Sequence, residues 1–248
     1  MITIIIPTYN NVVSLLSLIN TIMLEKYENY EIIIIDDAST DNTQEACQQI
    51  NNKQVFYYRN PHNIGTTQSR FKGLQYAKGA YIKFFDDDDE WISDAMGQQL
   101  QFLKTHNYNF VFSNYRVNNS VDNIQYVRNL ADYGSNFTQQ IIKQPGPFFQ
   151  ACLFKVDFIK KQASYFDSKA EPSEDWDFFI SLSYNKIKAA YYNVTIFQWN
   201  YTSHSQSSNY KNETLALAYI INKHKEHILQ RGSKKIFSKH LRILGSRF

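Results

Sequence analysis

The stretch EIIIIDDASTDNT (Glu31–Thr43) joins an apolar run directly to an acidic loop. Its consecutive isoleucines are apolar on both faces of a strand, which is typical of a parallel strand lying between two layers of helices. The acids and hydroxyls that follow stand at the carboxyl end of that strand, the edge at which parallel α/β sheets bind ligands. This stretch therefore predicts an α/β fold with a polar ligand site at the strand end.

The same order of apolar strand and helix continues on both sides of this stretch. β-Branched and apolar runs predict strands at Ile2–Ile6, Glu31–Ile35, Gln54–Tyr58 and Ala80–Phe85. Helical spacing and capping residues predict helices at Asn11–Leu24, Asp41–Ile50 and Gly65–Ala77. These β–α units in series predict a parallel, doubly wound sheet.

The chain after Trp91 is less regular. Its patterns predict helices at Ser93–His106, Glu174–Tyr184 and Glu213–Leu229, and extended segments at Phe110–Asn114 and Ala189–Asn200. We therefore divide the chain into a regular α/β half at residues 1–91, a more variable half at 92–208 on the same sheet, and a C-terminal tail at 209–248.

The composition is that of a globular protein. The 248 residues are 43% hydrophobic and 20% charged, which excludes a disordered chain. The apolar run Ile32–Ile35 is far shorter than the ~20 residues of a membrane span, and Met1 is not followed by a secretory signal. Two cysteines, Cys47 and Cys152, are too few for a disulfide framework. These features predict a cytoplasmic protein.

Charge is unevenly distributed along the chain. Residues 223–248 hold eight Lys and Arg against one acid, which leaves 18 basic and 22 acidic residues, a net charge of −4, in residues 1–222. A basic tail on an acidic body indicates an anionic partner such as phospholipid. The tail lacks the interleaved aromatics and the fold motifs of nucleic-acid-binding proteins, so we expect no nucleic-acid partner.

A second acidic strand end, Asp86–Asp89, directly follows the apolar strand that ends at Phe85. Carboxylates gathered at one edge repel one another unless a cation binds, and a divalent ion with oxygen ligands suits them. An EF-hand is excluded because the loops that start at Asp37 and Asp86 lack its glycine and glutamate. No glycine-rich phosphate loop follows any strand, so a metal and basic side chains would hold phosphates. Acids of the first loop, Asp41 above all, can equally cap the next helix.

Five motifs together resemble a family 2 glycosyltransferase of GT-A fold, in the expected order along residues 1 to about 185. They are Pro7-Thr8-Tyr9-Asn10, Ile35–Thr43, Asn63-Ile64-Gly65 with Arg70, Phe85–Asp89 and Glu174-Asp175. The resemblance implies a Rossmann-like mixed sheet, largely parallel, with helices on both faces and a helical C-terminal tail. Residues 1–91 would bind the nucleotide sugar, residues 92–208 would form the acceptor-binding half of the same GT-A domain, and residues 209–248 would form helices with a basic end.

The resemblance also implies roles for single residues. Thr8 and Asp37 would contact the base, usually uracil, Arg70 would approach the base or the diphosphate, and Asp86 would contact the ribose. The implied nucleotide site as a whole comprises Pro7, Thr8, Tyr9, Asp37, Asn63, Arg70, Asp86 and Asp87.

Metal and catalytic roles follow from the same resemblance. Asp88, the second acid of the D-x-D element, would bind Mn²⁺ or Mg²⁺, and His204 would be a further metal or diphosphate contact. Because position 87 is itself acidic, the choice among Asp87, Asp88 and Asp89 stays open. Asp175, with Glu174 beside it, matches the base that takes the acceptor proton. Without the upstream motifs, this pair is ordinary charge at a helix N-terminus.

Three aromatic residues have two interpretations at this stage. Trp91, Tyr9 and Trp176 are either walls of the acceptor site or residues of the core.

The implied activity is the metal-dependent, inverting transfer of one hexose or N-acetylhexosamine from a nucleotide diphosphate sugar, usually a UDP-sugar. The acceptor would be a hydroxyl of a glycan or lipid-linked acceptor in bacterial O-antigen, capsule or lipooligosaccharide synthesis. Gln198-Trp199 lacks the arginine of the processive motif Q-x-x-R-W, which indicates single additions.

Two other functional classes would have different sequence features. A catalytically weak, glycosyltransferase-like binding subunit would have lost the base or the D-x-D acids. A sugar nucleotidyltransferase would carry a glycine-rich, basic loop after the first strand. The sequence has the acids and lacks the loop.

The end of the tail has the apolar spacing of a helix. One stripe is formed by Phe237, Leu241, Leu244 and Phe248. The opposite face carries Lys235, Lys239 and Arg242. An apolar stripe backed by cations is typical of a helix at a membrane interface. We expect residues 233–248 to dock at the inner face of the cytoplasmic membrane, and the alternative is a terminal helix packed on the body.

Overall fold

The structure is a computed structural model and describes residues 1–92, 94–203 and 208–247. Three residues that the sequence singled out, His204, Phe248 and the helix start Ser93, lie outside the described residues. The strands are β1 (Ile2–Thr8), β2 (Tyr30–Asp36), β3 (Val55–Arg59), β4 (Tyr81–Phe84), β5 (Glu90–Trp91), β6 (Phe110–Asn119), β7 (Ile124–Arg128), β8 (Cys152–Lys155) and β9 (Ala189–Tyr201).

Helices connect and cover these strands. The α-helices are α1 (Val12–Met23), α2 (Thr43–Gln48), α3 (Thr66–Tyr76), α4 (Ala95–Thr105), α5 (Ala131–Ser135), α6 (Phe137–Lys143), α7 (Val156–Ile159), α8 (Glu174–Leu182), α9 (Tyr210–Lys223), α10 (Lys225–His227) and α11 (Lys234–Gly245). Shorter turns are the 3₁₀ helices η1 (Phe149–Ala151), η2 (Lys160–Tyr165) and η3 (Ser168–Ala170), and the π-helical turn η5 (Ile228–Gly232).

One mixed sheet runs through the molecule in the order β3-β2-β1-β4-β8-β6-β9-β5, with β7 paired to β6. Strands β1 to β4 are all parallel, as the β–α units predict. In the second half, β8 is antiparallel to β4 and β6, whereas β6 and β9 are parallel. The register sets Thr8 opposite Asp36, so the polar ends of β1 and β2 lie side by side.

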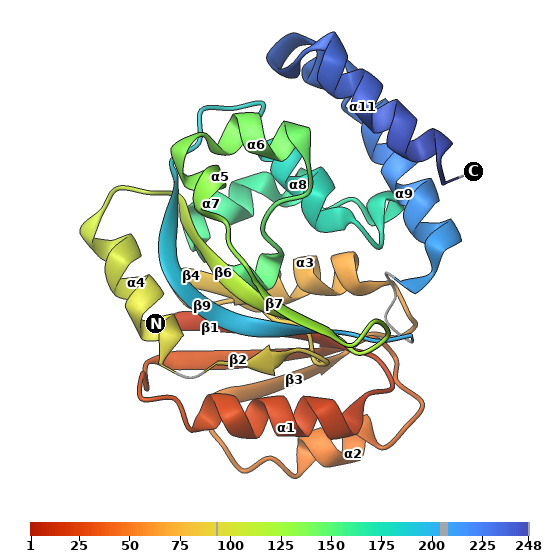
Figure 1. The fold of residues 1–248 in the computed structure, drawn as a ribbon. Helices are drawn as coiled ribbons and strands as arrows, with labels where there is room; N and C mark the ends of the chain where they lie inside the picture. The colour runs from red at the N-terminus through yellow and green to blue at the C-terminus, as the bar shows by residue number, and fades with distance from the viewer. Residues whose placement is uncertain (93, 204–207, 248) are drawn as a thin grey trace.

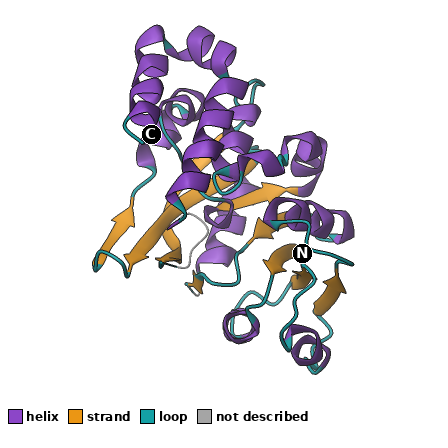
Figure 2. Cartoon of the chain, turned by 90° about the vertical axis from the view of Figure 1, so that its right-hand side faces the viewer, coloured by secondary structure: helices purple, strands orange, loops and turns teal. Residues whose placement is uncertain are grey.

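Helices cover both faces of the sheet. In Figure 1, α1 and α2 lie below the sheet and α3 lies above it. Figure 2 shows the molecule from the side, with two helices viewed end-on below the strands and most of the other helices above them. Helices α9 and α11 lie at the upper right of Figure 1, on the side of the sheet that α3 and α8 cover.

The isoleucine run of β2 lies in the core, as its apolar pattern predicts. Ile32, Ile33, Ile34 and Ile35 are at most 1% exposed, and burial of each such side chain contributes roughly 1.5–3 kcal/mol. Helix α3 approaches β1 closely at Gly73, where an added Cβ would lie 2.4 Å from a methyl carbon of Ile5. A residue larger than glycine there would push the helix away from the sheet.

Two sequence predictions differ from the structure. The predicted single helix at Glu213–Leu229 is wrong, because the chain divides into α9, α10 and η5. The break falls at His224, whose fully buried ring bonds the Asp177 carboxylate at 2.7 Å and the Tyr184 hydroxyl at 2.6 Å. The predicted strand at Phe110–Asn114 is too short, since β6 extends to Asn119 through its pairing with β7.

Candidate active site

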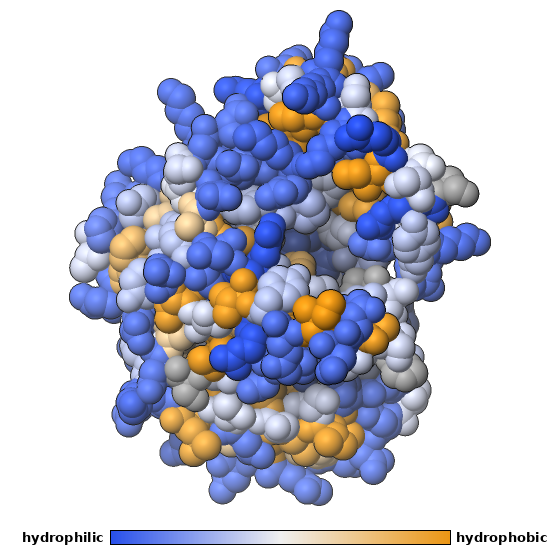
Figure 3. Space-filling view, in the orientation of Figure 1, coloured by the Kyte–Doolittle hydropathy of each residue, from blue (hydrophilic) through white to orange (hydrophobic). Residues whose placement is uncertain are grey.

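A cleft of about 1800 Å³ opens at the carboxyl ends of β1, β2 and β4. Its other wall is formed by the start of α8, the segment Lys143–Gln150, and parts of α9 and α11. Figure 3 shows the surface hollowed between α11 and the sheet. All described residues that the sequence assigned to the site line this cleft: Pro7, Thr8, Tyr9, Asp37, Asn63, Arg70, Asp86, Asp87, Asp88, Glu174 and Asp175.

Three of the four acids after β4 are held by hydrogen bonds or an ion pair from neighbouring residues. Asp87 accepts hydrogen bonds from the Thr8 hydroxyl and, at 3.0 Å, from the Asn11 amide. Asp89 is buried and accepts from the backbone N–H of Asn200 at 3.2 Å. Asp86 pairs with Arg70 at 2.6 Å. These three carboxylates are therefore fixed in the wall of the cleft.

Asp88 differs from its neighbours because its carboxylate bonds no other side chain among the described residues and is exposed to the cleft. The surrounding cleft walls and the charge of Asp86 raise the pKa of Asp88 to about 6. Burial, followed by the charge of Asp88, raises the pKa of Asp87 to about 7. Burial also raises the pKa of Asp89 well above its usual value. These acids therefore ionise less readily than free carboxyl groups unless a cation neutralises them.

These residues suit a divalent cation whose coordination shell is completed by a bound substrate and water. Among residues 1–92, 94–203 and 208–247, no three His, Cys, Asp or Glu side chains converge as a metal site. A single accessible carboxylate beside uncompensated acids suits Mg²⁺ or Mn²⁺, because Mg²⁺ commonly binds one or two carboxylates together with substrate phosphates and water. Asp88 is the residue placed to supply that carboxylate.

Asp37 lies in the cleft wall with both carboxylate oxygens occupied. One oxygen accepts from Asn60 at 2.7 Å and from the backbone N–H of Ile64 at 2.9 Å, and the other accepts from the N–H of Gly65 at 2.8 Å. Gly65 has a φ of +85°, and an added Cβ would meet the Glu171 carboxylate oxygens at 3.2 Å. Asp37 thus orders the loop before α3, and that loop requires glycine at position 65.

Arg70 joins the two sides of the cleft and is not a free cation. Its guanidinium pairs with Asp86 and with Glu174, both at 2.6 Å, and its side chain is 2% exposed. The Phe149 ring lies 5.3 Å below the guanidinium carbon. Both ends of this guanidinium are already bonded, so Arg70 holds protein carboxylates together.

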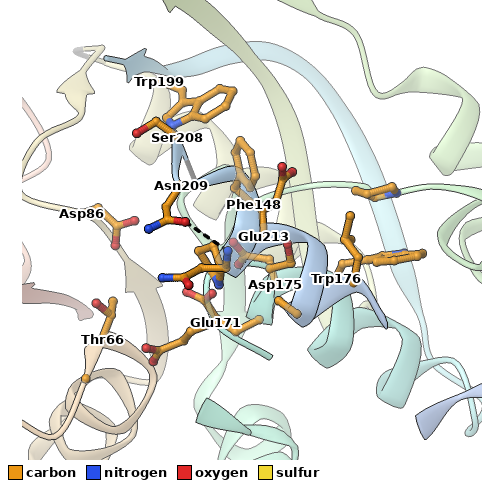
Figure 4. A pocket seen from close by; sticks show the side chains of 18 of the residues that line it. Thr66, Asp86, Phe148, Glu171, Asp175, Trp176, Trp199, Ser208, Asn209 and Glu213 are labelled. Carbon is orange, nitrogen blue, oxygen red and sulfur yellow. Dashed lines mark hydrogen bonds between the residues drawn. The ribbon is translucent and has the colours of Figure 1, made fainter. Parts of the chain in front are cut away.

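Asp175 and Glu174 begin α8 and differ in their bonding. Asp175 accepts a 2.8 Å hydrogen bond at Oδ1 from the backbone N–H of Phe149, and its Oδ2 bonds no described residue. Burial, followed by the charge of Glu174, raises the pKa of Asp175 well above its usual value. Glu174 is instead paired to Arg70. Figure 4 shows Asp86 and Asp175 facing the same space.

Aromatic rings form one side of the cleft. The Phe148 and Trp199 rings lie 5.1 Å apart and are half-buried at its edge (Figure 4). Of the three aromatic candidates, Trp91 belongs to the core, where its Nε1 donates to Glu25 at 2.7 Å. Tyr9, 49% exposed, and the buried Trp176 both line the cleft.

Gln150 is a site residue that the sequence analysis missed. Its Nε2 donates to Asp86 and, at 3.1 Å, to Asp89. Its backbone carbonyl accepts from the buried ammonium of Lys83 at 2.7 Å. The sequence does contain one indication of its role, a single glutamine within the apolar run Phe148–Phe154. A polar side chain among core residues needs hydrogen-bonding partners, which here are the site carboxylates.

Helix α11 packs on the body through one edge of the predicted stripe. Leu244 of that stripe is buried together with His240, and Phe237 packs against the core, whereas Leu241 is 49% exposed. The predicted stripe is therefore divided between the body and solvent. The reason is His240, whose Nε2 meets the backbone carbonyl of Ile142 at 2.8 Å and turns that face of the helix toward α6.

No helix in the described part of the chain is long and apolar enough to span a bilayer.

Comparisons with known proteins agree with this architecture. The family model "Glycosyl transferase family 2" matches residues 3–163. The chain is 33% identical over 117 residues to an Escherichia coli protein named UDP-Glc:alpha-D-GlcNAc-diphosphoundecaprenol beta-1,3-glucosyltransferase WfaP, covering 47% of each chain. This chain spans about half the length of the curated relatives that it matches.

Two groups of solved structures share the fold. The structure of S. aureus TarS 1–349 with UDP-GlcNAc has a TM-score of 0.69 at 18% identity, covering 92% of this chain and 70% of TarS. The mannosyltransferase PcManGT from Pyrobaculum calidifontis, solved with GDP-Man and Mn²⁺, has a TM-score of 0.63 at 15% identity, covering 99% and 75%. The fold is thus the GT-A fold of glycosyltransferases. Since the family model matches well over half of the sequence, this chain belongs to glycosyl transferase family 2.

Proposed function

We propose that this protein transfers a single hexose or N-acetylhexosamine from a UDP-sugar to a hydroxyl of a glycan or lipid-linked acceptor, with inversion and with Mn²⁺ or Mg²⁺ as cofactor. The observation that carries the proposal is that Asp88 and Asp175, an accessible acid and a partly bonded carboxylate, line the same cleft. The products would be surface polysaccharides such as O-antigen, capsule or lipooligosaccharide.

The donor assignment is supported by the likeness to WfaP, whose name includes UDP-Glc, and to TarS, solved with UDP-GlcNAc. Thr8 and the loop ordered by Asp37 would hold the base, with Asp86 near the ribose. Pro7, Tyr9, Asn63 and Asp87 complete this side of the cleft. Residues 1–91 would bind the donor and residues 92–208 the acceptor, and the helices of 209–248 would complete the wall.

The cofactor assignment is supported by the uncompensated acids and by the Mn²⁺ reported with PcManGT. Asp88 would hold the ion, and His204, outside the described residues, would be a second contact. A divalent ion bound there neutralises the charge that develops on the leaving diphosphate.

Asp175 would act as the general base. Its Oδ2 takes the proton of the acceptor hydroxyl while that oxygen attacks the anomeric carbon, and the bond to the nucleoside diphosphate breaks on the opposite side. The N–H of Phe149 holds the other oxygen at 2.8 Å and so orients the carboxylate. Glu174, paired to Arg70, would position α8. The rings of Phe148 and Trp199 would stack against the acceptor sugar.

A thermal-shift panel of nucleotide sugars, each with and without Mn²⁺, tests the proposal. A bound donor raises the apparent stability by mass action, so we expect one UDP-sugar with Mn²⁺ to raise the Tm most. That donor is then assayed for release of UDP with a lipid-linked acceptor. No Tm shift with any nucleotide sugar would contradict the proposal, and binding without turnover would favour the weak binding subunit.

We also propose that residues 233–248 bring the protein to the inner face of the cytoplasmic membrane, where a lipid-linked acceptor resides. The exposed Leu241 and Ile243, 49% and 40% accessible, support this. Co-sedimentation with phosphatidylglycerol and phosphatidylcholine vesicles tests it. We expect wild-type protein to bind the anionic vesicles and the variant Leu241→Ser/Ile243→Ser to bind them more weakly. Failure of the wild type to bind at low salt would refute the docking.

A further inference from the structure

A second, smaller groove lies between α6 and α11. Its volume is about 530 Å³, and its lining consists of Gln140, Lys143, Gln144, Lys235, Ile236, Ser238, Lys239 and Arg242. Four of these residues are cations, and no carboxylate lines the groove. Such a hollow attracts a compact anion, because concave walls of one charge concentrate the field.

The cations of this groove are not neutralised by the protein. Within the described residues, no acid lies at ion-pair distance from Lys143, Lys235, Lys239 or Arg242. Two other cations of the C-terminal region are paired: Arg247 bonds Glu213 at 2.7 Å, and Lys223 bonds Asp167 and Asp177. The four cations of the groove thus keep their full charge around one hollow.

The groove is built on elements that the protein holds firmly in place. The Trp176 Nε1 donates to the backbone carbonyl of Ile141 at 2.8 Å, and the His240 ring meets the next carbonyl, that of Ile142. The Trp176 and His240 rings lie 5.4 Å apart. The end of α6 is therefore fixed both to α11 and to the residue that follows Asp175.

The groove also adjoins the cleft, because Lys143, Gln144 and Lys239 line both cavities. An anionic group seated in the groove therefore lies next to the cleft that Asp175 lines. The acids Asp86–Asp89 follow β4 on the sheet side of that cleft, whereas the cations of the groove stand on α6 and α11.

We propose that this groove binds the diphosphate of a lipid-linked acceptor and thereby presents the acceptor sugar to Asp175. The inference rests on the proposed function and names its acceptor class, a glycosyl diphosphate carried by a lipid. A diphosphate bears several negative charges within a few ångströms, which matches four unpaired cations around one small hollow. The groove lies on α11, a helix that also carries the exposed apolar residues Leu241 and Ile243.

The binding test uses the full chain and two probes, decyl diphosphate and UDP with Mn²⁺, measured by calorimetry. We expect Lys235→Ala and Arg242→Ala, singly and combined, to weaken decyl diphosphate binding by about tenfold for each cation removed, the usual strength of a charge-assisted hydrogen bond. UDP affinity should stay unchanged, because the donor site lies on the sheet side. Lys234→Ala, on the same helix but outside the groove, is the matched control.

The transfer test compares two synthetic acceptors, N-acetylglucosamine linked to an undecyl chain through a diphosphate and the same sugar as a simple undecyl glycoside. We expect groove variants to lower kcat/KM for the diphosphate acceptor about tenfold per cation, and to leave the glycoside unaffected. The preference for the diphosphate acceptor should also fall as salt is raised.

Each other outcome has a distinct meaning. Equal decyl diphosphate affinity of wild type and variants overturns the groove assignment, as does an equal loss on both acceptors. Loss of UDP affinity in the variants would assign the groove to the donor and would also overturn the acceptor assignment.

If the variants lose only binding to phosphatidylglycerol vesicles, the cations bind the membrane, and the acceptor assignment is overturned. Absence of transfer with intact, groove-dependent diphosphate binding would refute the proposed function and leave the diphosphate site standing.

Discussion

Arg70 and Glu174 form a 2.6 Å ion pair that ties α3 to the first turn of α8, although 104 residues separate them in the chain. The same guanidinium bonds Asp86, also at 2.6 Å. One buried cation therefore connects the acid run after β4 with the helix that carries Asp175. The distance between the two sides of the cleft depends on this connection.

We expect Arg70→Met to lower the free energy of unfolding by about 3–5 kcal/mol, because it leaves two carboxylates without their countercharge. Urea denaturation measures the change. The control is Lys26→Met, which removes a surface pair with Asp94 whose side chains are 83% and 46% exposed. Solvent screens that exposed pair, so its loss should change the stability far less than Arg70→Met does. Similar losses of unfolding free energy in the two variants would show that the Arg70 ion pairs stabilise the fold no more than a surface pair does.

Asp175→Asn keeps the shape of the side chain and removes its ability to take a proton. Transfer should fall roughly 10²–10⁴-fold, while UDP affinity changes little, because a base on the acceptor side acts mainly in the transition state. Steady-state kinetics and UDP calorimetry measure both quantities. Wild-type turnover in Asp175→Asn would make this residue a helix-capping acid.

The pH profile gives an independent check on the same residue. Burial and the charge of Glu174 raise the pKa of Asp175, and a base works only when deprotonated. The rate should therefore rise with pH through a pKa above that of an ordinary carboxyl group. Glu174→Gln removes the neighbouring charge, so its acidic limb should move to lower pH. A limb that does not move would show that another group titrates.

Asp88→Ala should abolish the part of UDP affinity that depends on Mn²⁺, together with transfer, because this is the one acid of its run that bonds no other side chain among the described residues. Asp87→Asn is the comparison, since Asp87 already accepts hydrogen bonds from Thr8 and Asn11. We expect this variant to keep its response to Mn²⁺. The reverse pattern in UDP titrations with and without Mn²⁺ would move the metal role to Asp87.

Lys83 is completely buried beneath the site, and burial lowers its pKa from 10.5 to about 7. Between these two pH values the unfolded chain binds more protons than the folded chain, so the contribution of Lys83 to stability increases as pH rises. Relative to Lys83→Met, the wild type should gain at most about 1.4 kcal/mol per pH unit between pH 7 and 9. Thermal or urea unfolding at pH 6, 7, 8 and 9 measures this difference. A difference that does not change with pH would show that Lys83 has an ordinary pKa in the fold.

The amino-acid sequence alone determined the sheet of the first half and the position of its ligand edge. β-Branched apolar runs such as Ile32–Ile35 favour strands buried on both faces, and β–α units in series place the carboxyl ends of parallel strands at one edge. The acids of the strand ends therefore meet in one cleft, as predicted. These features follow from local patterns that repeat along the chain.

The tertiary structure alone decided which partner each of these side chains meets. Arginine is a residue type that often binds phosphate, yet the guanidinium of Arg70 forms ion pairs with Asp86 and Glu174. Trp91 is a core residue, and Trp199, on a strand far along the chain, lines the cleft in its place. The spacing of α11 permits several buried faces, and one hydrogen bond from His240 selects among them. Such choices depend on segments that are distant in the sequence and adjacent in space, so periodicity and motif spacing contain no information about them.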